Sequence, residues 1–302
     1  MIKRDFLNVF DFTKEEILAI LKRAAELKLN PASTPSVLKD KIVGMLFDKS
    51  STRTRVSFEV GILQLGGNSI FLTSAGMQLG RGETVHDTAR VLSRYLDAIV
   101  IRTYAHEIIE EFATHASIPI INALTDLHHP CQALADMLTI YEKKQTYNLK
   151  MAYLGDGNNV AHSLIQVASR LGTELVIACP EGYAPDAQLL EDAIAESSAG
   201  IRVLTDPAEA ARDADVLYTD TWVSMGQEDK TKDRDILFRD FQVNDHLLKA
   251  AKPDSIVMHC LPAHRGHEIT DSVMDGPHSV VFDQAENRLH SQKAVLEFLL
   301  PG

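Results

Sequence analysis

Cysteine is scarce in this sequence of 302 residues: it occurs three times, as Cys131, Cys179 and Cys260. Three widely spaced thiols do not form the even, closely spaced set that a disulfide framework requires. The N-terminal segment lacks the apolar run of a secretory signal, and no apolar run approaches the ~20 residues of a membrane helix. We therefore expect a cytoplasmic protein with no membrane partner.

An excess of positive charge is also missing, because 30 Lys and Arg residues stand against 42 Asp and Glu residues, a formal net charge of −12. General binding to nucleic acid or to an anionic membrane needs a broad basic surface, since it depends on counterion release. The sequence therefore predicts no nucleic-acid partner. Any anionic ligand has to be held locally, by a few cations and backbone N–H groups.

What the chain does contain is a globular composition, with 45% hydrophobic and 24% charged residues, and a length that favours two domains. Short apolar runs alternate with amphipathic stretches, which is typical of parallel βα units. A capping box of Thr13 and Glu16 marks the first helix. The expected strands are 42–47, 69–72, 98–101, 118–121, 151–154, 174–178, 201–204, 216–218, 256–258 and 280–282.

Polar residues at 143–150 interrupt this alternation and predict a domain boundary. We expect an α/β protein of two domains, 1–144 and 145–284, each a mostly parallel sheet flanked by helices. The last helix, within 285–302, comes too late to begin another unit and is expected to complete the first domain. Ligands of open α/β sheets bind beyond the carboxyl ends of the strands, so the active site is expected in the cleft between the domains.

The segment 51–55 follows the first strand and opens a helix with three hydroxyl side chains and two arginines. Hydroxyls cap the first turn, free N–H groups point outward and the arginines add charge, which suits a phosphate group. The glycine-rich run of a P-loop is missing. An ordinary helix cap with solvated arginines is the alternative.

Further polar residues stand at the ends of other strands. Arg102 ends an apolar strand, where pairing with a local acid is the alternative. His129 and Gln132 lie about one turn apart at a helix start, so both can reach one carbonyl oxygen. A capping histidine beside a surface glutamine is equally ordinary, so this pair depends on its neighbours.

The segment Gly155-Asp156-Gly157 invites comparison with a dinucleotide-binding fingerprint. The third glycine would fall on Val160, and the next strand ends without an acid to hold a ribose, so nicotinamide binding is not favoured. Asn158 and Asn159 are better interpreted as amide donors to a carboxylate, with turn asparagines as the alternative.

Three histidines and a cysteine follow the strand at 256–258, as His259, Cys260, His264 and His267. Their crowded spacing matches no familiar zinc pattern, so we expect no metal. Cys260 as a nucleophile with a histidine base is a competing interpretation, and a buried inert thiol is the third.

Taken together, four segments resemble the aspartate/ornithine carbamoyltransferase family, and their order and spacing extend over nearly the whole chain. The segments 51–55 and 129–132 match the wider family, and 220–226 and 259–262 match its ornithine branch. The resemblance implies transfer of the carbamoyl group of carbamoyl phosphate to the δ-amine of L-ornithine, without a cofactor. It also implies a homotrimer with sites completed between subunits, and a role in arginine metabolism, most naturally biosynthesis.

The resemblance also implies residue roles. Phosphate would contact Ser51, Thr52, Arg53, Thr54 and Arg55; the carbamoyl group would contact Arg102, His129, Gln132 and Arg288; ornithine would contact Asn159, Asp220, Ser224 and Met225. Gln78 matches a position that reaches a neighbouring subunit's site, and Cys260 with Leu261 lies where both substrates meet.

The implied mechanism is direct attack of the amine, so Cys260 orients the substrate and forms no covalent intermediate. Two rivals from other classes remain, a nicotinamide-linked oxidoreductase and an amino-acid-binding protein that closes over its ligand. Phosphate release from carbamoyl phosphate and ornithine separates all three.

Overall fold

The computed structural model describes residues 3–31, 34–196, 200–223 and 231–301. The chain divides into two compact units: the first unit comprises Met1–Ala135 with Glu286–Gly302, and the second comprises Asp136–Ala285. None of the helices in the described ranges combines the length and the apolar character needed to cross a membrane.

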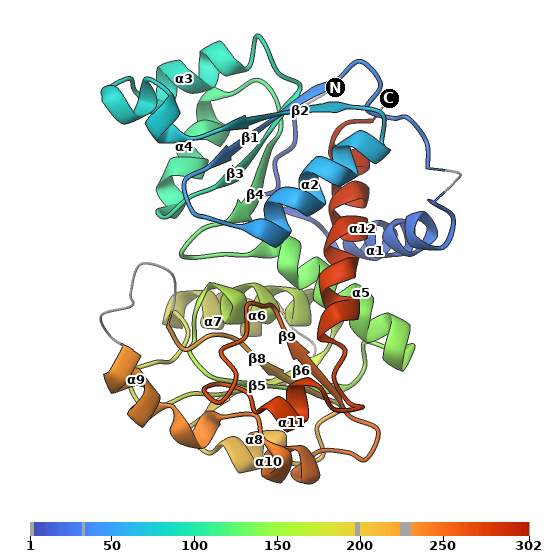
Figure 1. The fold of residues 1–302 in the computed structure, drawn as a ribbon, viewed down its shortest axis with the longest axis vertical. Helices are drawn as coiled ribbons and strands as arrows, with labels where there is room; N and C mark the ends of the chain where they lie inside the picture. Colours follow the sequence, from blue (N-terminus) through green and yellow to red (C-terminus); the bar gives the residue numbers. More distant parts are fainter. Residues whose placement is uncertain (1–2, 32–33, 197–199, 224–230, 302) are drawn as a thin grey trace. The chain divides into compact units, whose positions relative to one another are not determined.

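The first unit is built on a parallel sheet of four strands in the order β2-β1-β3-β4 (Figure 1). Buried apolar residues such as Leu46, Ile101 and Phe112 form a core between this sheet and its helices. The strands are β1 (Ile42–Phe47), β2 (Asn68–Leu72), β3 (Ala98–Arg102) and β4 (Ile120–Leu124), and the helices are α1 (Lys14–Leu29), α2 (Thr52–Gln64), α3 (Val85–Leu92) and α4 (His106–His115).

The second unit has a parallel sheet of five strands in the order β7-β6-β5-β8-β9. Its strands are β5 (Lys150–Leu154), β6 (Glu174–Ala178), β7 (Ile201–Leu204), β8 (Val216–Thr219) and β9 (Ile256–His259). Its helices are α6 (Asn159–Leu171), α7 (Ala187–Glu196), α8 (Pro207–Ala211), α9 (Thr231–Leu237), α10 (Asp245–Ala250) and α11 (Asp271–Met274).

Two helices belong to both units along the chain, α5 (Pro130–Lys144) and α12 (Val281–Leu299). The part of α12 from Glu286 onward clusters with the first unit. Gln145 directly follows α5 with a positive φ of 57°, so the helix ends in a left-handed residue.

The fold class expected from the sequence is confirmed, since each unit is a parallel sheet flanked by helices. The capping box of α1 is also confirmed: Thr13 Oγ1 accepts from the Glu16 N–H, and Glu16 Oε2 accepts from the Thr13 N–H at 2.9 Å. Most expected strands agree with the observed ones to within one residue, whereas β4 lies two to three residues later than expected.

The strand expected at 280–282 is wrong. Ser279 makes one isolated bridge to Val257, the Val280 N–H donates to the Val257 carbonyl at 3.0 Å, and α12 begins at Val281. The Gln284 N–H already donates to the Val280 carbonyl in a helical turn. The β-branched residues suggested a strand, but the tertiary setting overrides this weak preference.

The strand orders locate where ligands are expected to bind. The chain order reverses between β1 and β3 in the first unit, and between β5 and β8 in the second. Such a switch point opens a crevice at the carboxyl ends of the two strands. Segment 51–55 and Arg102 lie at the first switch point, and residues 155–159 and Asp220 lie at the second.

Candidate active site

The first cluster of predicted residues includes those at the switch point of the first unit, and we call it the cationic half-site: Ser51–Thr54, Arg102, His129, Gln132 and Arg288. It begins at the N-terminus of α2, where Ser51 is the N-cap and its Oγ accepts from the Thr54 N–H at 3.2 Å. Thr52 is exposed and Arg53 is half-buried on this first turn. The turn therefore has the N–H groups, hydroxyls and charge that a phosphate needs.

Arg288 of α12 ties this turn to α5. Its guanidinium donates from Nη1 to Gln132 Oε1 at 2.5 Å and from Nη2 to Thr54 Oγ1 at 3.0 Å. All three side chains are buried, at 2–3% exposure. Residues separated by up to 234 positions in the chain are thus joined by direct hydrogen bonds.

His129 lies in the same electrostatic environment. Its side chain is 5% exposed, and burial places the pKa of its imidazole well below the usual range. The positive charges of Arg288, Arg102 and Arg53 depress the same pKa further. A neutral imidazole surrounded by three arginines can donate a hydrogen bond to a developing oxyanion without adding a fourth charge.

Two other predicted residues are exposed. Arg55 is exposed, pairs with Glu59 at 3.0 Å, and stacks over the Phe71 ring at 3.8 Å. Gln78 is exposed at the start of a 3-10 turn, Leu79–Arg81.

The second cluster lies at the switch point of the second unit, and we call it the acidic half-site: Asn158, Asp220 and Cys260. The Cys260 thiol donates to Asp220 Oδ1 at 2.7 Å, and Asn158 Nδ2 donates to Asp220 Oδ2 at 2.8 Å. Asp220 is 7% exposed. The cluster therefore presents one carboxylate held by two neutral donors.

Asn158 is also the N-cap of α6. Its Oδ1 accepts from the backbone N–H groups of Val160 and Ala161, and the Tyr153 hydroxyl donates to the same oxygen at 3.2 Å. Asn158 is therefore a helix cap and a support for Asp220. Asn159, the first residue of α6, is half-buried beside it. Ser224 and Met225 lie outside the described residues.

Within the described part of the chain, Asp220, His259 and Cys260 form a group that could hold a metal ion, with ligand atoms within 4.8 Å of one another. The His259 ring is already engaged at both nitrogens: Nδ1 accepts from the Leu261 N–H at 2.8 Å, and Nε2 lies 3.0 Å from Glu268 Oε1. The possible ligand atoms of Asp220, His259 and Cys260 are therefore all engaged in hydrogen bonds within the protein. Leu261 has a positive φ of 57°, in the left-handed region that side chains disfavour.

An ion pair beside the acidic half-site was not predicted from the sequence. Asp156, considered only within a glycine-rich fingerprint, forms an ion pair at 2.5 Å with Arg234 of α9. The sequence feature that could have indicated this ion pair is the acidic residue itself, which follows a buried strand. Its partner lies 78 positions away, in a polar stretch that no local pattern connects to it.

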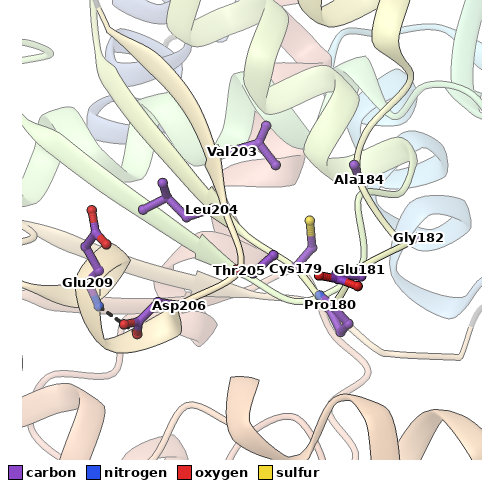
Figure 2. Close-up of a pocket in the computed structure, with 10 residues that line it drawn as sticks. All are labelled: Cys179, Pro180, Glu181, Gly182, Ala184, Val203, Leu204, Thr205, Asp206 and Glu209. Carbon is purple, nitrogen blue, oxygen red and sulfur yellow. Dashed lines mark hydrogen bonds between the residues drawn. The ribbon is translucent and has the colours of Figure 1, made fainter.

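A separate pocket of about 380 Å³ opens at the carboxyl ends of β6 and β7 (Figure 2). Cys179 and Pro180 line one part of it, Val203 and Leu204 another, and the lining also includes the acidic residues Glu181, Asp206 and Glu209. It includes none of the predicted site residues. Its carboxylates do not suit a phosphate ligand.

Comparisons with known proteins identify the family of both halves of the chain. Residues 4–142 match the family model described as the carbamoyl-P binding domain of aspartate/ornithine carbamoyltransferase, and residues 147–299 match the Asp/Orn binding domain of the same family. An ornithine carbamoyltransferase from Syntrophus aciditrophicus is 56% identical over 304 residues, covering 99% of this chain and 100% of the relative.

Two further matches come from Pyrococcus furiosus. A protein named "Ornithine carbamoyltransferase, anabolic" is 53% identical over 305 residues, covering 99% of this chain and 97% of the relative. The solved structure of an ornithine carbamoyltransferase from this organism matches with a TM-score of 0.96 and 53% identity, covering 99% of this chain and 98% of that one.

Proposed function

This chain belongs to the aspartate/ornithine carbamoyltransferase family, and from that premise we propose that it transfers the carbamoyl group of carbamoyl phosphate to the δ-amine of L-ornithine. The products are L-citrulline and phosphate. The enzyme is a transferase. The observation that carries the choice of substrates is the charge of the two half-sites, which is cationic around His129 and anionic at Asp220.

Carbamoyl phosphate binds to the first domain in this proposal, residues 1–144 completed by 285–302. The phosphate occupies the first turn of α2, where Ser51, Thr52, Thr54 and the arginines Arg53 and Arg55 supply donors. The positive end of the helix and the charge-assisted hydrogen bonds stabilise the departing phosphate.

The carbamoyl oxygen is placed near Arg102, His129, Gln132 and Arg288. As the amine attacks, negative charge develops on this oxygen, and preorganised donors lower the barrier most effectively at such a point. Arg288 is already fixed by Gln132 and Thr54, so little reorganisation is required. His129 donates in its neutral form, in keeping with its lowered pKa.

L-Ornithine binds to the second domain, residues 145–284, in this proposal. Asp220 and Ser224 hold the α-amine, Asn159 holds the carboxylate, and Met225 is a further ornithine contact. A δ-amine has a pKa near ~10.4 by analogy with lysine, and its protonated form has no lone pair. Desolvation in the half-site favours the neutral amine, which is the form that attacks.

Cys260 and Leu261 are proposed to lie where both substrates meet, with the Cys260 thiol, which donates to Asp220, orienting the attacking δ-amine. The attack is direct, because the phosphate is already a good leaving group and no covalent enzyme intermediate is needed. Gln78 completes the site of a neighbouring subunit in a homotrimer. This part of the proposal rests on the family resemblance of the sequence.

The direction of the pathway is proposed as arginine biosynthesis, supported by the relative that is named anabolic. A cytoplasmic location fits this role. The site chemistry alone serves both directions, so the pathway rests on that relative.

The test is phosphate release coupled to citrulline formation, measured with both substrates and with each omitted. Both products should form in equal amounts, and only when carbamoyl phosphate and L-ornithine are present together. Binding of ornithine without turnover would favour an amino-acid-binding protein. Binding of nicotinamide nucleotide without citrulline formation would favour an oxidoreductase.

A further inference from the structure

A second carboxylate lies beside the acidic half-site and has its own counter-ion. Asp156 follows β5, and Asp220 follows β8, the neighbouring strand in the sheet. Arg234 Nη1 donates to Asp156 Oδ2 at 2.5 Å, and the two side chains are only 11% and 14% exposed. Removing one partner of such a buried pair leaves an uncompensated charge.

Further contacts fix the position of Arg234. The same Nη1 donates to the Trp222 carbonyl at 2.5 Å, and the guanidinium lies 4.9 Å from the ring centre of Tyr183 and 5.8 Å from that of Phe238. A planar guanidinium can stack and donate at once, which an ammonium group cannot do. Arg234 therefore links the segment after β5 to the segment after β8.

The segment after β5 also supports Asp220. The Tyr153 hydroxyl donates to the Asp156 carbonyl at 2.9 Å and to Asn158 Oδ1, and Asn158 donates to Asp220. A displacement of Asp156 would therefore reach Asp220 through Asn158. This gives Arg234 a route to the half-site without contact with the substrate.

The two carboxylates differ in their compensation. Asp220 is held by the neutral donors of Asn158 and Cys260, and in the described ranges no lysine or arginine pairs with it. Asp156 is paired with Arg234. Burial raises the pKa of Asp156, the Arg234 pair opposes this increase, and the negative charge of Asp220 adds to it.

We infer that Arg234 is a specificity-determining positioning residue, which neutralises Asp156 so that the half-site attracts a single amino group and tolerates an amino-acid carboxylate. The inference rests on the proposed function. L-Ornithine carries two amino groups and a carboxylate, whereas the diamine putrescine carries the same reacting amine and no carboxylate. With Asp156 uncompensated, two negative charges would attract the diamine and repel the carboxylate.

The experiment compares kcat/KM for putrescine and L-ornithine at saturating carbamoyl phosphate, by formation of carbamoylputrescine and citrulline. Arg234→Met should raise the putrescine-to-ornithine ratio by about tenfold or more. Asp156→Asn leaves Arg234 uncompensated and should lower the ratio. The double variant removes both charges and should return the ratio to within about threefold of the wild-type value.

Two further variants separate charge from structure. Arg234→Lys keeps the charge and should keep the ratio near the wild-type value, although KM for ornithine rises because the stacking and the bond to Trp222 are weakened. Arg202→Met removes an arginine from an exposed ion pair with Glu174 in the same unit and should change neither substrate.

The inference would be overturned if Arg234→Met lowered kcat/KM equally for both substrates and the double variant did not restore it. Arg234 would then have only a structural role. A change of the same sign in the two single variants would also overturn it. If Arg234→Met does not fold, as judged by circular dichroism, the sign of the Asp156→Asn change decides. Absence of citrulline formation by the wild-type protein would instead refute the proposed function.

Discussion

The two units carry side chains of opposite charge at equivalent places in their sheets. In the first unit, where segment 51–55 and Arg102 lie at the β1/β3 switch point, burial and the charges of three arginines depress the pKa of His129. In the second, a buried carboxylate accepts from an amide and a thiol at the β5/β8 switch point. The shared topology supplies the location, and the residues that follow each strand supply the chemistry.

The half-sites also differ in how they are held. The cationic half-site is braced by charge-assisted hydrogen bonds from Arg288, which originates in the C-terminal helix. The acidic half-site is braced by neutral donors and by Tyr153, a buried tyrosine of β5. Removing a charge from one half-site should therefore impair the substrate that binds there more than the other substrate.

The largest effect is expected from Arg53→Ala, which removes a half-buried charge from the cationic half-site. We expect kcat/KM for carbamoyl phosphate to fall by about 10³-fold, because a charge-assisted contact to the departing phosphate is lost. Steady-state kinetics on the folded variant measures this. Arg23→Ala, which breaks a surface ion network with Glu26 and Glu297, is the matched control and should leave the kinetics unchanged.

Arg55→Ala sharpens the same test. Arg55 is exposed and already contacts Glu59 and Phe71. Its removal should therefore lower kcat/KM for carbamoyl phosphate by only about 10- to 100-fold. Equal losses in the two variants would mean that both arginines contribute equally to phosphate binding. Near-normal kinetics of folded Arg53→Ala would remove the phosphate assignment.

The next effect in size is expected from Asp220→Asn, which removes the charge of the acidic half-site with little change in shape. We expect kcat/KM for L-ornithine to fall by about 10²-fold, while KM for carbamoyl phosphate stays within about twofold. Asp275→Asn, at an exposed ion pair with Arg265, is the control. Equal changes for both substrates would contradict the division of labour between the half-sites.

These half-sites were predictable from the sequence to different degrees. Segment 51–55, Arg102 and Asp220 could be located because each follows an apolar strand, and the carboxyl ends of parallel strands share an edge. Arg288 could not be located in this way. It lies in the middle of a helix, 234 positions from Thr54, and only the family resemblance assigned it to the site.

Interactions between distant side chains account for the rest of what was missed. Asn158 was interpreted as an amide donor to a carboxylate, but neither its role as the N-cap of α6 nor its bond to Asp220 was predicted. The pairing of Asp156 with Arg234 depends on how α9 packs, which no local pattern encodes. Likewise, the run at 280–282 has strand-like residues, yet a helix begins within it because tertiary contacts outweigh local preference.

A smaller effect is expected from Cys260→Ser. If the thiol, which donates to Asp220, orients the δ-amine, a serine hydroxyl preserves most of the contact with Asp220. We therefore expect kcat to fall by about tenfold or less. Mass spectrometry after mixing the wild-type protein with carbamoyl phosphate alone should find no adduct. Cys179→Ser, outside the half-site, is the control; a carbamoylated Cys260 would establish nucleophilic catalysis instead.

The smallest effect is expected on the free energy of unfolding, whose pH dependence tests whether His129 is neutral in the folded protein. Burial, with Arg288, Arg102 and Arg53, places the pKa of folded His129 below its ordinary value of 6.5. Below pH 6.5 the unfolded chain therefore binds a proton that the folded protein does not. The stability that His129 contributes is complete above pH 6.5 and is lost as the pH falls, at up to about 1.4 kcal/mol per pH unit.

His129→Gln removes this proton, so its free energy of unfolding should depend less steeply on pH between about 6.5 and 5 than that of the wild-type protein. Urea unfolding at three pH values measures the slopes, and His246→Gln, at an exposed position on α10, should keep the wild-type slope. Equal slopes in His129→Gln and wild type would mean that the folded protein protonates His129. The arginines would then tolerate a fourth charge, and the oxyanion would face an imidazolium rather than a neutral donor.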